Sequence, residues 1–88
     1  MHFKIARSID MVAWFDKNGV PNPIRFRLDG EAGESITIKI DQIITRDKEK
    51  LAGNPILIFN CQDCVNGTQK LFEIKYELRT CKWILYKI

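Results

Sequence analysis

The chain has 88 residues and a formal net charge of +3, a length that accommodates one domain, residues 1–88, with a small core. Its hydrophobic fraction of 45% and charged fraction of 28% are ordinary for a folded globular domain and argue against disorder. No apolar run reaches the roughly 18 residues of a membrane span, and the N-terminus lacks the apolar segment of a secretory signal. We therefore expect a cytoplasmic protein without a membrane-spanning segment.

Hydrophobic residues alternate with polar ones along most of the chain, which is the pattern of half-buried β-strands and not of helices. Residues 18–23 contain Asn18-Gly19 and two prolines, so they are predicted to form a loop. Residues 47–52 are good helix formers and are predicted to form a short helical segment. Strands are predicted, in chain order, near residues 11–17, 24–29, 35–45, 56–62, 69–79 and 82–87, with a short edge strand around Phe3 and Ile5. The expected fold is all-β: a small antiparallel barrel or curled sheet of about six strands, SH3-like.

Two C-terminal hairpins allow the register to be predicted. Asn66-Gly67 favours a two-residue turn, which places Cys61 opposite Phe72. In the last hairpin, a two-residue turn at Thr80-Cys81 would set Leu78 opposite Trp83, although neither turn residue favours positive φ and a bulge is the alternative. The further pairs that the first turn predicts are Val65–Thr68, Asp63–Lys70, Phe59–Ile74 and Leu57–Tyr76.

This register leaves four apolar residues on the second face of the sheet, namely Ile56, Ile58, Ile84 and Tyr86. One interpretation is that the sheet curls and that residues 47–52 or the N-terminal residues cover this face. The other is a surface for a protein partner or for a homodimer.

The spacing Cys61-Gln62-Asp63-Cys64 is that of a zinc-binding or dithiol motif. A zinc site needs two further ligands, for which only Cys81 and His2 are candidates. The hairpin register places Cys81 at the far end of a strand and puts Cys61 and Cys64 on opposite faces, so an incidental or structural CxxC is the simpler interpretation. Three cysteines also make a closed disulfide framework improbable.

A basic surface with exposed aromatic side chains is the third feature with chemical meaning. Small β-domains that bind single-stranded nucleic acid combine cations for the phosphates with aromatic rings for the bases. Acidic residues interleave with the basic ones here, as they also do on an ordinary solvated sheet. The residues predicted to contribute to a binding surface are Trp14, Arg25, Arg27, Lys39, Lys75, Ile84 and Tyr86.

No constellation of residues amounts to an active site, because the single histidine is His2 and no carboxylate pair is evident. No cofactor-binding loop is present. The pattern Trp14-Phe15-Asp16, Pro23-Ile24-Arg25-Phe26-Arg27, Ala52-Gly53-Asn54 and Trp83-Ile84-Leu85 resembles that of small uncharacterised bacterial all-β proteins of clostridial type. The resemblance implies a compact all-β fold and no particular activity. The sequence therefore favours a non-enzymatic binding or protein-interaction module, with nucleic-acid binding or a zinc-dependent module as alternatives.

Overall fold

The computed structural model describes residues 4–30, 32–65 and 67–88, apart from the side chains of Lys4, Leu51, Cys64 and Val65. Three residues named in the predictions lie outside these residues: His2, Phe3 and Asn66. Among the described residues, no helix is long and apolar enough to cross a membrane. Seven strands follow one another: β1 (Lys4–Phe15), β2 (Pro21–Asp29), β3 (Ser35–Lys39), β4 (Gln42–Leu51), β5 (Asn54–Val65), β6 (Thr68–Glu77) and β7 (Lys82–Lys87).

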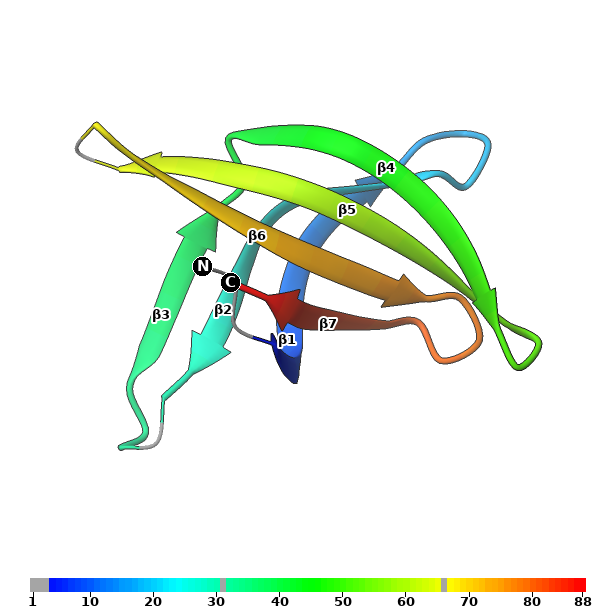
Figure 1. Ribbon diagram of the computed structural model, residues 1–88, viewed down its shortest axis with the longest axis horizontal. Helices are drawn as coiled ribbons and strands as arrows, with labels where there is room; N and C mark the ends of the chain where they lie inside the picture. Colours follow the sequence, from blue (N-terminus) through cyan, green and yellow to red (C-terminus); the bar gives the residue numbers. More distant parts are fainter. Residues whose placement is uncertain (1–3, 31, 66) are drawn as a thin grey trace.

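All seven strands belong to one antiparallel sheet with the order β3-β2-β1-β7-β6-β5-β4. The long strand β1 connects its two parts: residues 10–15 pair with β2, whereas residues 4–9 pair with β7. Strands β1–β3 consequently cross the strands β4–β7, as Figure 1 shows. The core lies where these two parts meet.

Aromatic side chains from both parts build that core. The rings of Phe26 on β2 and Phe72 on β6 meet edge to face with their centroids 5.5 Å apart. On the other side of the core, the rings of Tyr76 and Trp83 lie 4.5 Å apart. All four side chains are buried, so the inward faces of β2, β6 and β7 are those that the alternation of hydrophobic residues predicts.

The prediction of an all-β antiparallel fold is confirmed, but the prediction of a barrel or curled sheet of the SH3-like kind is wrong. The sheet is not closed, because in the described part of the chain no ladder joins the edge strands β3 and β4. The predicted strand 35–45 is in fact split. The amide of Ile40 donates to the carbonyl of Ile24, whereas the next amide, that of Asp41, donates to the carbonyl of Gln62. Adjacent residues thus bond to opposite parts of the sheet, and the chain passes from β3 to β4.

The prediction of a short helical segment at residues 47–52 is also wrong, because these residues form the second half of β4 and a tight turn. Asp47 pairs with Ile58 and Glu49 with Ile56. Ala52 and Gly53 make the turn into β5 with φ angles of 52° and 82°, the left-handed pair that a two-residue hairpin turn requires. Pairing with the apolar strand β5 therefore overrides the local helix propensity.

The predicted register of the first C-terminal hairpin is confirmed in every pair, from Val65–Thr68 to Leu57–Tyr76. The register of the last hairpin is wrong, because Trp83 pairs with Tyr76 and not with Leu78. A longer turn of residues 78–81 replaces the two-residue turn, and only Cys81 in it adopts a positive φ, of 59°. The same faces still meet, because the displacement is by an even number of residues.

Candidate functional site

The residues predicted to form one binding surface lie on two separate parts of the sheet. Four of them project from the solvent-facing side of β1–β3: Trp14, Arg25, Arg27 and Lys39. The other three belong to β6 and β7: Lys75, Ile84 and Tyr86. The sequence could not distinguish these groups, because the order of the strands was unknown from it.

The first group forms a continuous surface, which we call the Trp14 face: Asp10, Val12, Trp14, Arg25, Arg27, Thr37 and Lys39. The pairing of the strands brings Val12, Arg25 and Lys39 into one row across β1, β2 and β3. Trp14 follows Val12 on the same side of β1 and is 55% exposed, and Val12 is 46% exposed. An exposed aromatic ring and an exposed aliphatic side chain thus share one side of the sheet with two cations.

The turn between β1 and β2 fixes the position of Trp14. The Asp16 carboxylate accepts hydrogen bonds from the amides of Asn18 and Val20 at 2.8 and 2.9 Å, and Gly19 adopts a φ of 81°. A bulge after Val12 adds Ile24 to the β2 side of the pair. Bulges increase local twist and redirect side chains, so this one sets how Trp14 projects relative to Arg25.

Charge on the Trp14 face is positive on balance. Arg27 donates to the Asp10 carboxylate at 2.7 Å, and this hydrogen bond, with the negative charge of Asp10, raises the pKa of Arg27. Arg25 and Lys39 have no ion pair or hydrogen bond from their side chains among the described residues. A hollow of about 230 Å³ includes Arg25 and both members of the pair in its lining, which consists of Asp10, Met11, Val12, Arg25, Phe26, Arg27 and Thr37.

The second group is occupied by contacts within the protein. The Lys75 ammonium lies 3.2 Å from the Glu49 carboxylate and 3.7 Å from the centre of the Tyr86 ring. Ile56, on the same side of the sheet, is buried although it is not part of the main core. Ile84 is half-buried. Lys75 therefore lies over the Tyr86 ring and beside Ile58 and Ile84 on the neighbouring strands, and Glu49 lies beside Ile56.

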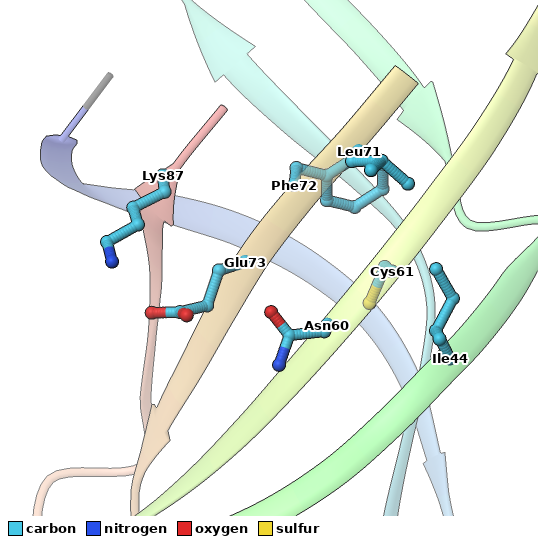
Figure 2. Close-up of a pocket in the computed structure, with 7 residues that line it drawn as sticks. All are labelled: Ile44, Asn60, Cys61, Leu71, Phe72, Glu73 and Lys87. Atoms are coloured by element: carbon cyan, nitrogen blue, oxygen red, sulfur yellow. The ribbon is translucent and has the colours of Figure 1, made fainter. Parts of the chain in front are cut away.

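A further hollow of about 240 Å³ lies on the outer side of β4–β7. Figure 2 shows the polar ends of Asn60 and Glu73 on neighbouring strands, with Lys87 beyond Glu73. The Asn60 amide donates to the Thr45 hydroxyl at 2.9 Å. The remaining lining, Ile44, Cys61, Leu71 and Phe72, is apolar.

The CxxC motif lies within the unbroken strand β5. Residues three apart on an extended strand are separated by about 10 Å, so no tight turn brings the two cysteines together. Cys61 is buried in the core, and burial raises the pKa of its thiol to about 12, which keeps it protonated at neutral pH and poor as a metal ligand. The described residues contain no group of three or more His, Cys, Asp or Glu that could hold a metal. The Cys64 side chain and His2 lie outside them, and a zinc site therefore stays a prediction.

Val12, Asp10 and Thr37 belong to the Trp14 face and were not predicted. The available signal was spacing, because Asp10, Val12 and Trp14 occupy alternate positions on one strand. Thr37 could be found only from the pairing of β2 with β3, which the sequence did not define.

No protein-family model matches the chain, and no curated protein or solved structure matches it either. The resemblance to clostridial-type proteins therefore stays a prediction, and any assignment of function depends on the geometry of the surface.

Proposed function

We propose that the protein is a non-enzymatic binding module of the bacterial cytoplasm, and that its Trp14 face binds single-stranded nucleic acid. The observation that carries the proposal is the exposed indole of Trp14, which lies on the same side of the sheet as Arg25 and Lys39. Both cations lack a partner among the described side chains.

A single strand fits this chemistry because its bases are free to stack and its phosphates are regularly spaced. Stacking of one base on an aromatic side chain contributes about 1–3 kcal/mol and tolerates any sequence. The cations Arg25 and Lys39 supply the electrostatic part, which weakens with salt. Asp10 offsets the positive charge of Arg27. The face therefore carries few cations without a partner, and the predicted affinity is low.

A double helix fits less well. A broad sheet face does not enter the major groove, and paired bases have no free face for Trp14 to stack on. The preference for single strands is thus part of the proposal.

The β6–β7 group supports a protein-binding or homodimer function less strongly. Lys75 and Glu49 already cover its apolar residues, with the Lys75 side chain only 16% exposed. The Trp14 face, in contrast, exposes both its aromatic and its aliphatic member.

The test is a titration of a fluorescein-labelled oligothymidine of about 12 nucleotides, within the range of site sizes of small β-domains, at about 20 mM salt, where the electrostatic contribution is large. Trp14→Ala should weaken binding by about 5- to 150-fold, the equivalent of one stacked base. Arg25→Gln should weaken it and also reduce the slope of affinity against salt by about 0.7. Lys17→Gln removes the same charge from the exposed β1–β2 turn and serves as the control.

Intrinsic fluorescence gives a second readout, because Trp14 is exposed and the other tryptophan, Trp83, is buried. Bound single strand should quench Trp14 and leave the emission of the Trp14→Ala variant unchanged. Absence of binding at low salt by a folded protein would refute the nucleic-acid function. Binding that Trp14→Ala does not affect would show that another surface is used.

A further inference from the structure

The edge strand β4 carries an alternation of charges, Arg46-Asp47-Lys48-Glu49-Lys50, which the sheet sorts onto its two sides. Arg46 and Lys48 pair with Phe59 and Leu57, which belong to the core side. Asp47 and Glu49 pair with residues of the outer side. The core side of the edge is therefore basic, and its outer side is acidic.

The contacts of Arg46 and Glu49 confirm that the two kinds of charge lie on opposite sides of the sheet. The Arg46 guanidinium lies 5.4 Å from the centre of the core ring of Phe59 and donates to the carbonyl of Pro21 at 3.1 Å. Glu49 pairs with Lys75 on the outer side at 3.2 Å. For the other three residues, Asp47, Lys48 and Lys50, whose side chains are exposed, the described structure gives no hydrogen bond or ion pair.

The sorting decides which strand can be added at this edge. If the β4 strands of two copies paired antiparallel, the two-fold axis between them would be perpendicular to the sheet. The core sides of both copies would then lie on the same side of the combined sheet. Every directly opposite pair along residues 46–50 would then join like charges, which destabilises a β-ladder. Parallel pairing of two copies would bring opposite charges together, but it is the less stable ladder. The edge thus disfavours its own copy in the more stable arrangement, as protected edges do.

We propose that the edge of β4 binds an extended segment of another protein in antiparallel pairing. Its acidic side chains would lie on the core side beside Lys48 and Lys50, and a basic side chain would lie on the outer side beside Asp47. Main-chain hydrogen bonds to the open edge supply affinity in this mode of recognition, and the alternate side chains supply selectivity. The site differs from the Trp14 face in both position and partner.

A synthetic peptide of alternating glutamate and lysine, about ten residues long to span β4, is the probe, and a block peptide of equal composition, lysines first, is its control. We expect the alternating peptide to shift backbone amide signals of residues 46–50 in heteronuclear NMR spectra at low salt. The block peptide should bind about 3- to 100-fold more weakly, because it cannot form all three opposite-charge pairs. Lys48→Thr/Lys50→Thr should weaken binding, whereas Lys17→Thr/Arg79→Thr, an equal loss of charge in exposed turns, should not.

Three results would overturn the proposal. One is equal affinity for the two peptides, which would show that the order of charges along the peptide does not contribute to binding. Another is a set of shifted amide signals on β1–β3, which would show that the peptide binds the Trp14 face and not the edge of β4. The last is sedimentation of the wild-type protein as a dimer that Lys48→Thr/Lys50→Thr dissociates, which would assign the edge to a second copy in parallel pairing.

Discussion

Replacement of Phe72 by alanine should remove a large part of the stability of the protein. Phe72 is 2% exposed and its ring contacts Phe26 across the two parts of the sheet. Truncation of a fully buried phenylalanine costs about 3–5 kcal/mol, which includes the cavity that it leaves. A chain of this length has a free energy of unfolding of only about 4–13 kcal/mol, so Phe72→Ala should remove at least about a quarter of it, and nearly all of it at the low end of that range.

Urea denaturation followed by circular dichroism measures the effect. With a slope of about 1 kcal/mol per molar urea, the midpoint should fall by about 3–5 M. Leu71→Ala is a matched control, because the adjacent residue faces the opposite side and is 41% exposed; it should cost less than about 1 kcal/mol. If Phe72→Ala does not fold, Phe72→Leu should still lower the free energy of unfolding by about 1–2 kcal/mol. Equal effects at positions 71 and 72 would refute the assignment of faces on β6.

Three further predictions concern single residues. Ala52→Gly should raise the free energy of unfolding by about 1 kcal/mol, because Ala52 has a φ of 52° that strains a side-chain-bearing residue; a melting temperature that fails to rise by about 4–8 °C would contradict this. Because the pKa of Cys61 is raised to about 12, its contribution to stability is complete below the pKa of an unfolded thiol and is lost as the pH rises from about 9 towards 12, by up to about 1.4 kcal/mol per pH unit. Urea curves at pH 8 and 10.5 should show this loss in the wild type relative to Cys61→Ala, and parallel pH profiles of the two would exclude it. Arg46→Ala should cost about 1–2 kcal/mol through loss of its hydrogen bonds to Pro21 and Asn22, whereas a similar cost for the exposed neighbour Lys48→Ala would show that these bonds contribute nothing.

Local pattern predicted the positions of most strands and one hairpin, but not the division of 35–45 into β3 and β4 or the extension of β4 to Leu51. Asn66-Gly67 specifies a particular turn, and every pair up to Leu57–Tyr76 follows from it by counting. Thr80-Cys81 does not favour any particular turn type. The last turn is therefore set by the packing of Tyr76 on Trp83, a tertiary contact that turn propensities do not describe. Segment 47–52 shows the converse case, in which helix formers become a strand because β5 offers them a ladder.

The candidate site was predictable only in part. Trp14, Arg25, Arg27 and Lys39 were identified as exposed residues, but their gathering on one face depends on β1, β2 and β3 being neighbours. Lys75 was identified with them, although it lies on β6, which β7 separates from β1, the nearest strand of that face. Strand order depends on contacts between distant segments, and alternation along a strand carries no information about it.

The division of β1 between two neighbours has a consequence for how the chain folds. Ser8 pairs with Ile84, so the ladder that unites the sheet joins nearly the first described residues to nearly the last. Hairpins such as β5–β6 can form as soon as they leave the ribosome, whereas the β1–β7 ladder must wait until β7 has been synthesised. Closure of so long a loop is slow, and folding should take milliseconds to seconds. Until then, the inner sides of both parts are open to the solvent, and this interval is when the protein is most exposed to aggregation.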